Sequence, residues 1–408
     1  MQLGLEQIAA LLARLGDPQL GVPAILVAGT NGKGSVTAYA SAILRAQGLR
    51  TGSFFSPHLL RVNERIRIDG DEIPSPELDR IARRLRRLHG RFPFTFFEGL
   101  TAAAAVWFRE RGAGAAVWEV GLGGRLDATR LVDARVTAIT GISMDHREHL
   151  GRTKAKILGE KLGIARPGVP LVANLGSAAL RRVAARRCAA AGVPLHAIGE
   201  EVSVSASRCR PDGMDLSLVT PLRDYGTVRV RMPGRVQAGN AATAVRAAEL
   251  FLPGRSPSRA AVRAGLAGAM LAGRFQVLPG NPRIVLDVSH NEEALLASLA
   301  TLRDISPPQR SVLLFGVLAR KELGRFPRRA LRSAREVVLV PLKDEGSART
   351  ADLERLFAGA GSDGDRSRIT VTRSMRDGIR YALGRLEPRD TLLVLGSHLT
   401  VEEAVGCL

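Results

Sequence analysis

Ile25-Leu-Val-Ala-Gly-Thr-Asn-Gly-Lys-Gly-Ser35 is the stretch that decides the fold of the first half of this chain. It runs from an apolar, strand-like segment through a glycine-rich turn directly into a helical pattern. Such a turn points backbone N–H groups at phosphates, the helix N-terminus adds positive potential, and Lys33 supplies a full charge. Ser35 is placed to reach a magnesium ion. A purely structural turn is the alternative, and the Gly-Lys-Gly-Ser order disfavours it.

Strand-like runs alternate with helical patterns on both sides of this stretch, which favours layered α/β domains. The expected strands of the first half are Ala24–Ala28, Thr51–Phe55, Ala115–Val120, Val136–Ile142 and Val169–Ala173. Helical patterns cover Val36–Gln47 and Glu98–Arg111, and later Ala241–Leu250 and Ser258–Leu271. The more β-like segment Glu201–Met232 predicts a small antiparallel insertion.

After Gly273 the alternation begins again, which predicts a second domain. Its expected strands are Arg283–Val288, Val312–Val317, Val337–Leu342, Ile369–Thr372 and Thr391–Leu395. We therefore expect a P-loop ATPase domain over 1–271, with a mainly parallel sheet and a small antiparallel segment. A smaller Rossmann-like domain of ordinary size follows over 276–408.

Composition narrows the classes of protein further. The chain has 408 residues, 45% of them hydrophobic, and no apolar run long enough to cross a membrane, so we expect a cytoplasmic protein without a signal peptide. Three scattered cysteines offer no disulfide or metal motif. The net charge of +20 invites a nucleic-acid interpretation, but aromatic residues are only 4% and the arginines are spread over many helices. We expect a solvated basic surface around anionic ligands.

Polar residues follow several predicted strands at the points where these strands end. Ser56 comes after Thr51–Phe55, Glu119 ends its strand, and Asp145-His146 follows Val136–Ile142. Ligands of open α/β sheets gather at this edge, and magnesium prefers oxygen donors. Taken singly, Glu119 could be an ion-pair partner, His146 a capping residue and Ser56 a turn residue. Their shared edge favours a metal site.

Several segments form a recognisable set: Val27-Ala-Gly-Thr-Asn-Gly-Lys-Gly-Ser35, Ser56-Pro-His-Leu59, Thr95-Phe-Phe-Glu98, Glu119-Val-Gly-Leu-Gly-Gly-Arg-Leu-Asp-Ala-Thr129, Asp145-His146, Glu160-Lys-Leu-Gly-Ile164, Asn240-Ala-Ala-Thr-Ala244, Gly273-Arg-Phe-Gln276 and Asp287-Val-Ser-His-Asn291. In these segments the sequence resembles the folylpolyglutamate synthase/dihydrofolate synthase family of the muramyl-ligase superfamily, collinearly from Leu3 onward. Their combination is specific, although the phosphate loop alone would not be.

The resemblance implies roles for individual residues. ATP would be held by Asn31, Gly32, Lys33, Gly34, Ser35, Asn240, Arg274 and Asp287. Magnesium, at two sites, would be bound by Ser56, Glu119, His146 and a carbamylated Lys161. Lys33, Lys161 and His146 would be the catalytic set. From the residues alone, a surface lysine of an amphipathic helix that pairs with Glu160 or a neighbour is the preferred interpretation of Lys161.

The resemblance also implies a reaction and a substrate pocket. The enzyme would be an amide ligase that activates a carboxylate with ATP and joins L-glutamate to dihydropteroate, to reduced folate or to both. The pocket would be lined by Leu3, Gly4, Leu5, Thr95, Phe96, Phe97, Glu98, Leu126, Asp127 and Ala128. Phe96 and Phe97 beside Thr95 suit a flat ring with hydrogen-bonding edges, but two core phenylalanines are the alternative. The partners would be these small molecules, with no nucleic acid or membrane, and the protein would be a monomer.

Several positions depart from the family pattern. The family usually carries a further segment before Leu3-Gly-Leu-Glu6, close to which this sequence begins; Arg130 replaces the usual Asn, and Leu162 replaces an Ala. Arg320-Lys321-Glu322 replaces Asp-Lys-Asp, which puts glutamate-site or closure details in doubt. The rival functions are another muramyl-superfamily ligase, a nucleic-acid-binding P-loop ATPase, and a non-catalytic nucleotide-binding relative.

Overall fold

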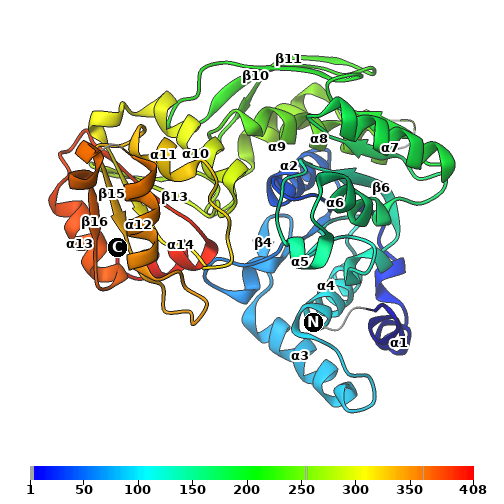
Figure 1. Ribbon diagram of the computed structural model, residues 1–408. Helices are drawn as coiled ribbons and strands as arrows, with labels where there is room; N and C mark the ends of the chain where they lie inside the picture. The colour runs from blue at the N-terminus through cyan, green and yellow to red at the C-terminus, as the bar shows by residue number, and fades with distance from the viewer. Residues whose placement is uncertain (1–3, 253, 255, 362) are drawn as a thin grey trace. The chain divides into compact units, whose positions relative to one another are not determined.

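The computed structural model describes residues 4–252, 254, 256–361 and 363–408 (Figure 1). They form two compact units. The first contains residues up to 205, 215–230 and 237–269, and the second contains 206–214, 231–236 and 270–408. The domain bounds 1–271 and 276–408 stay a prediction, and Leu3 lies outside the described residues.

An eight-stranded sheet is the framework of the first unit, in the order β4-β3-β2-β5-β1-β6-β7-β8. Its strands are β1 (Ala24–Ala28), β2 (Thr51–Phe54), β3 (Ile66–Ile68), β4 (Asp71–Glu72), β5 (Ala115–Glu119), β6 (Ala134–Ile139), β7 (Leu171–Ala173) and β8 (Leu195–Ala197). From β2 to β8 all neighbours run parallel, whereas β3 and β4 add antiparallel strands at one edge. β1 is buried along its whole length, as expected of a parallel strand covered on both faces.

Helices surround this sheet. They are α1 (Glu6–Arg14), α2 (Lys33–Ala46), α3 (Ser75–His89), α4 (Phe96–Glu110), α5 (Arg147–Leu150), α6 (Lys154–Lys161), α7 (Ala178–Ala190), α8 (Val236–Phe251) and α9 (Arg259–Gly268), with 3₁₀ turns η1 (Pro18–Leu20), η2 (Val62–Arg65), η3 (Ala128–Leu131) and η4 (Leu162–Ile164). α2 and α9 approach each other so closely that a Cβ added to Gly265 would lie 2.7 Å from the backbone of Ile43. The absence of a side chain at Gly265 permits this approach. α3 rests on α4 by its apolar face, which contains Leu78, Ile81 and Leu85.

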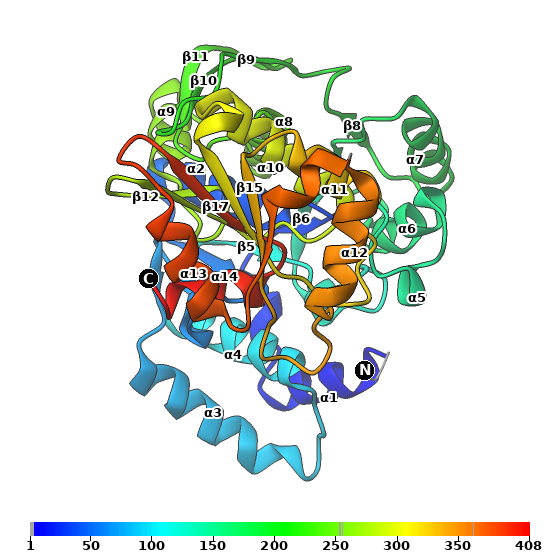
Figure 2. The ribbon, with the colours of Figure 1, turned by 60° about the vertical axis from the view of Figure 1, so that its left-hand side comes forward.

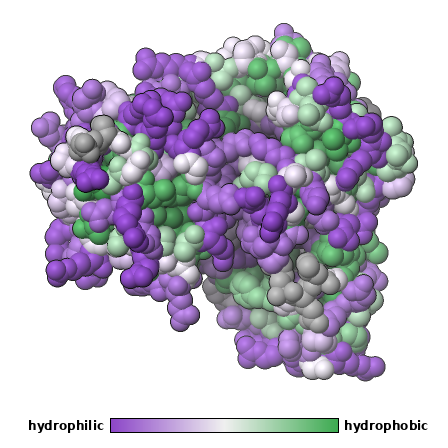
Figure 3. Space-filling model, in the orientation of Figure 1, coloured by the Kyte–Doolittle hydropathy of each residue, from purple (hydrophilic) through white to green (hydrophobic). Residues whose placement is uncertain are grey.

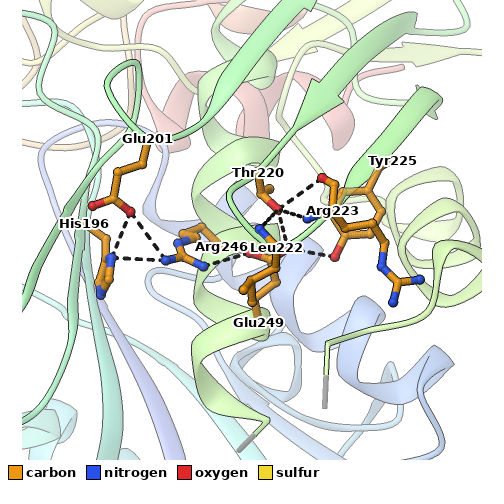
Figure 4. A network of polar contacts seen from close by, with 8 residues as sticks. All are labelled: His196, Glu201, Thr220, Leu222, Arg223, Tyr225, Arg246 and Glu249. Carbon is orange, nitrogen blue, oxygen red and sulfur yellow. Dashed lines mark hydrogen bonds and ion pairs between the residues drawn. The ribbon is translucent and has the colours of Figure 1, made fainter. Parts of the chain in front are cut away.

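A separate three-stranded sheet has the order β11-β10-β9. It is formed by β9 (Ser203–Ala206), β10 (Met214–Val219) and β11 (Asp224–Val230), within the segment for which the sequence predicted a β-like insertion. A buried polar network ties this part of the chain to α8 (Figure 4). Glu249 on α8 accepts hydrogen bonds from the hydroxyls of Thr220 and Tyr225, at 2.6 and 2.9 Å, and from Arg246 at 3.1 Å.

The second unit contains a six-stranded sheet in the order β12-β13-β17-β14-β15-β16. Its strands are β12 (Gln276–Leu278), β13 (Arg283–Asp287), β14 (Ser311–Phe315), β15 (Glu336–Leu339), β16 (Ile369–Val371) and β17 (Thr391–Leu395), and only β12 pairs antiparallel. Its helices are α10 (Glu292–Ile305), α11 (Phe326–Leu331), α12 (Thr350–Ala360), α13 (Met375–Gly384) and α14 (His398–Val405), with η5 (Pro308–Arg310) and η6 (Asp363–Arg368).

The alternation of side chains along these strands gives each face of the second sheet its own helices (Figure 2). Leu313 and Phe315 share a core with residues of α10, α11 and α12. Leu314 points the other way, toward α13, where a Cβ on Gly378 would lie 3.4 Å from its side chain. This mainly parallel sheet with helices on both faces confirms the layered α/β architecture that the sequence pattern predicted for the second domain.

The surface of the protein is largely hydrophilic on the face that Figure 3 shows. Some basic residues of the protein belong to solvent-accessible ion pairs, as Arg80 does with Glu77 and Glu110. No helix in the described part of the chain is long and apolar enough to cross a membrane.

Candidate active site

The glycine-rich turn has the shape that phosphate binding requires. Gly32 lies directly before α2 with φ of +90°, a conformation that side chains rarely adopt, so that Lys33 begins the helix. Gly29 also has positive φ, and a Cβ there would lie only 1.7 Å from Thr140 Oγ1. The turn therefore has no side chain at Gly29 or Gly32, and its backbone N–H groups lie next to those at the N-terminus of α2.

The segment after β6 holds this turn in place. Thr30 N donates to Gly141 O at 2.8 Å, and Thr140 Oγ1 donates to Asn31 O at 2.6 Å. Asn31 Nδ2 in turn donates to Ser143 Oγ at 3.0 Å. The sequence reasoning did not identify Thr140 or Ser143, because hydroxyl residues after a strand have no distinctive spacing.

Asn240 on α8 reaches the same turn from another part of the chain. Its side chain is 6% exposed and donates to Gln237 Oε1 at 3.0 Å. A Cβ on Gly32 would lie 2.4 Å from Asn240 Oδ1. Asn240, which the sequence predicts to bind the nucleotide, therefore lies against the phosphate loop.

Lys161, the last residue of α6, is buried beside the loop. It is 4% exposed, and its Nζ donates to Gly29 O at 2.7 Å. Burial lowers the pKa of the Lys161 amine to about 7, and the charge of Lys33 adds to this effect against the opposing charges of Asp145 and Asp127. Lys33 itself donates to Thr30 O at 3.2 Å.

Ser56 and Glu119 meet at the neighbouring strands of the sheet. Glu119 ends β5 and is 2% exposed, and its Oε2 accepts a hydrogen bond from Ser56 N at 3.1 Å. Because β5 lies between β2 and β1, both residues lie at the sheet edge that carries the phosphate loop. A carboxylate and a hydroxyl at this place are donors of the kind that magnesium prefers.

His146 lies immediately before α5 with φ of +48°, and its N–H donates to Asp145 Oδ1 at 2.9 Å. Its side chain is 37% exposed. The described residues contain no group of three or more His, Cys, Asp or Glu placed to hold a metal ion. The predicted set has only two residues of these types, Glu119 and His146, and takes its other donors from Ser56 and a modified Lys161. The metal assignment thus stays a prediction.

The predicted pterin segment Thr95–Glu98 begins α4. Thr95 and Glu98 form a capping box, in which Glu98 Oε2 accepts from Thr95 N at 2.7 Å and Thr95 Oγ1 accepts from Glu98 N at 3.3 Å. Phe97 packs at the edge of the core, 5.8 Å from the ring of Phe54. Phe96 is 64% exposed, so the alternative of two core phenylalanines is wrong for this residue.

The other predicted pocket residues differ in burial. Asp127 and Ala128 are buried, and Leu126, Gly4 and Leu5 are half-buried. Burial raises the pKa of Asp127, although hydrogen bonds from Thr129, Leu122 and Gly121 oppose this. Its carboxylate thus also organises the 121–129 loop, with Leu122 N donating to Oδ2 at 3.0 Å.

Arg65 is a candidate site residue that the sequence reasoning missed. It is 9% exposed, its Nε donates to His58 Nδ1 at 2.8 Å, and its guanidinium carbon lies 5.5 Å from the Phe96 ring centroid. Burial lowers the pKa of Arg65, whereas the negative charges of Glu119 and Glu64 oppose this. A single arginine in Asn63-Glu64-Arg65 has no periodicity that distinguishes it from the other arginines.

Arg274 and Asp287 belong to the second unit. Asp287 is 7% exposed, and its carboxylate accepts from Ser289 N at 3.0 Å and from the hydroxyls of Ser289 and Ser298 at 2.8 Å each. Burial raises the pKa of Asp287, and the charge of Arg274 is among the effects that oppose this. Their part in nucleotide binding stays a prediction.

Comparisons with known proteins agree with this architecture. The family described as Mur ligase, glutamate ligase domain, matches residues 273–398. The dihydrofolate synthase/folylpolyglutamate synthase of Escherichia coli K12 is 32% identical over 403 residues, which cover 98% of this chain and 90% of that protein. A solved structure of a bifunctional folylpolyglutamate synthase/dihydrofolate synthase with Mn, AMPPNP and L-glutamate bound has a TM-score of 0.85 at 30% identity, covering 100% of this chain and 94% of that one.

One longer relative is similar to this chain over about half of its own length. The probable bifunctional folylpolyglutamate synthase/dihydropteroate synthase of Haloferax volcanii is 34% identical over 98% of this chain. This chain spans about half of its length, 48%. The similarity therefore carries no conclusion about the remainder of that protein.

Proposed function

Because this chain belongs to the dihydrofolate synthase/folylpolyglutamate synthase family, we propose that it joins L-glutamate to dihydropteroate, to a reduced folate or to both, with ATP as the energy source. ATP would convert the pteroyl carboxylate into an acyl phosphate. The glutamate amine would then attack the acyl carbon and release phosphate, so that ADP and phosphate are the by-products.

The observation that carries this proposal is the arrangement around the phosphate loop. Gly29, Gly32 and the start of α2 offer backbone N–H groups to phosphates, and Lys33 adds positive charge. The buried Glu119 and Lys161 lie at the same loop-bearing edge of the first sheet. Phosphoryl transfer needs mainly positioning and charge neutralisation, so this set requires no nucleophilic side chain.

We propose ATP and a divalent metal as the cofactors, with Ser56, Glu119 and His146 among the metal ligands. The buried oxygen of Glu119, which also accepts from Ser56 N, fits magnesium, and the half-exposed His146 could add a nitrogen donor. A bound metal would neutralise charge on the transferred phosphoryl group. Two metal sites, a monomeric state and a cytoplasmic location remain parts of the proposal.

A carbamate on Lys161 is the finer part of the cofactor proposal. An ammonium among bound cations would be repelled, whereas a carbamate offers two oxygen donors. It forms when the neutral amine attacks CO₂, making an N–C bond and releasing one proton. Carbon-13 NMR of protein in ¹³C-bicarbonate should show one carbamate resonance that Lys161→Ala removes and Lys156→Ala keeps. A fully active enzyme without this resonance contradicts the carbamate.

Substrate-dependent ADP formation is the test of the main proposal. We expect ADP only when glutamate is present together with dihydropteroate or with tetrahydrofolate, assayed separately. Equal ATP turnover without both substrates would refute the ligase. Turnover that DNA or RNA stimulates in the absence of folate would instead support a nucleic-acid-dependent ATPase.

A further inference from the structure

The turn that follows Lys161 is in main-chain contact with the loop after β5. Arg125 N donates to Glu160 O at 3.1 Å. A Cβ on Gly124 would lie 3.0 Å from Lys161 O, and a Cβ on Gly163 would lie 2.5 Å from Arg125 Cα. Both glycines are required for this approach, because any side chain would separate the two segments.

Two arginines, one from each of the two chain segments, donate hydrogen bonds to backbone carbonyls of the other segment. Arg130, from η3, donates its Nε to Gly163 O at 2.8 Å. Arg166, which follows the turn, donates its Nη2 to Val132 O at 2.8 Å and also to Arg130 O. Burial lowers the pKa of Arg166 and the charge of Arg130 adds to this, which agrees with two guanidinium groups held close together.

The carbonyl that Arg130 binds lies two residues after Lys161. Carbonyl groups in the last turn of a helix have no partner within the helix, and a basic side chain there both satisfies them and interacts favourably with the helix dipole. By fixing Gly163 O, Arg130 fixes the path of the chain as it leaves Lys161. The amine that reaches Gly29 O across the phosphate loop depends on that path.

We propose that Arg130 is a positioning residue for Lys161, acting through the backbone of Gly163. This inference rests on the proposed function, in which Lys161 serves the phosphoryl-transfer site. Arg130 touches the turn and is not itself a catalytic residue.

Steady-state kinetics of three variants test the proposal. Arg130→Met keeps most of the side-chain stem and removes the donor, whereas Arg130→Lys keeps a donor and a charge. Arg135→Met is the matched control, because Arg135 is exposed and pairs only with Asp133 at 3.1 Å in the described contacts. We expect Arg130→Met to lower kcat about tenfold with the KM for ATP within twofold, because a displaced Lys161 affects the transition state more than ATP binding. Arg130→Lys should recover most of kcat, and Arg135→Met should match the wild type.

Chemical labelling of Lys161 supplies a readout that does not depend on activity. In CO₂-free buffer, acetic anhydride should acetylate Lys161 slowly relative to the exposed Lys156, as measured by mass spectrometry of the same digest. Arg130→Met should raise the ratio of Lys161 acetylation to Lys156 acetylation several-fold, and Arg135→Met should leave this labelling ratio unchanged.

The outcomes separate the inference from the proposed function. Wild-type kcat and wild-type labelling in Arg130→Met overturn the inference, and so does an equal loss of kcat in Arg130→Met, Arg130→Lys and Arg135→Met. A wild-type protein that forms no substrate-dependent ADP overturns the proposed function, while the labelling ratio still tests the position of Lys161.

Discussion

Replacing Glu249 by Gln should lower the free energy of unfolding of the first unit by more than the loss of an exposed ion pair does. Glu249 is 4% exposed overall and its side chain is fully buried, and it accepts hydrogen bonds from Thr220, Tyr225 and Arg246 (Figure 4). Burial and the charge of Glu249 raise the pKa of Tyr225, so the phenol stays protonated and donates. The carboxylate is the acceptor shared by two strand-side hydroxyls and one guanidinium.

The magnitude follows from what the substitution leaves behind. The Arg246 side chain is 6% exposed, and its Nε is buried without a hydrogen-bond partner among the described residues. Without the Glu249 charge, Arg246 keeps Glu201 at 3.4 Å and His196 at 3.2 Å. Removing one partner of a buried ion pair costs about 3–5 kcal/mol, and the remaining half-exposed Glu201 reduces this toward the lower figure.

Urea unfolding followed by circular dichroism measures the effect, with Glu200→Gln as the control. Glu200 pairs with Arg181 at 2.8 Å, but its side chain is 59% exposed, so its loss should cost below about 1 kcal/mol. Tyr225→Phe, which removes one donor to a charged acceptor, should cost about 1.5–3 kcal/mol. A Glu249→Gln protein within 1 kcal/mol of Glu200→Gln would refute the reasoning.

Three further predictions concern the loop and its surroundings. Lys33→Ala should lower kcat about 100-fold or more without a change in unfolding midpoint, since its charge acts on phosphate, and activity equal to that of Lys156→Ala would contradict this. Gly32→Ala should abolish ATP binding in calorimetry, because the added Cβ would lie 2.4 Å from Asn240 Oδ1. Gly48→Ala is the control: φ is +95° there too, but no described atom beyond its chain neighbours lies within 4 Å of the added Cβ, so it should lose only about 1 kcal/mol of stability. Glu64 accepts backbone N–H groups of Leu59, Leu60 and Arg61 at 2.8 Å each, and these lower its pKa below the ordinary 4.5 although burial opposes them. Its stabilisation is therefore complete above about pH 4.5 and is lost as pH falls through the lower folded pKa, so the deficit of Glu64→Gln in urea unfolding should shrink on acidification, and a deficit independent of pH would contradict it.

The sequence predicted those features that lie within one continuous segment. β1 and β17 have the expected bounds, because each is a short apolar run between turn residues. The short strands β3, β4, β8 and β12 were not predicted, since two or three residues show no measurable alternation. The predicted fold class is confirmed by the parallel sheets and by the structural relatives.

The site shows the same division between local and distant information. The glycines of the phosphate loop could be identified because their spacing is local. Thr140 and Ser143 could not, because their importance comes from hydrogen bonds to residues more than a hundred positions earlier. Arg65 was missed for a related reason: its burial beside Phe96, and the negative charge of Glu119 acting on it, arise only when the strands come together.

Lys161 shows most clearly what the fold adds to the sequence. As a residue of a helical pattern it could have been a surface lysine paired with Glu160. The structure contradicts that alternative, because Glu160 pairs with Arg125 at 3.3 Å while Lys161 turns inward to Gly29 O. A buried amine beside a second lysine lowers the stability of the fold, since both desolvation and like charge disfavour its protonated form. The contacts of Gly124, Gly163 and Arg130 hold it there all the same. A buried lysine with a lowered pKa that several contacts hold in place is typical of a functional position, which is why the Lys161 carbamate and the Arg130 contact are the parts of the site to test first.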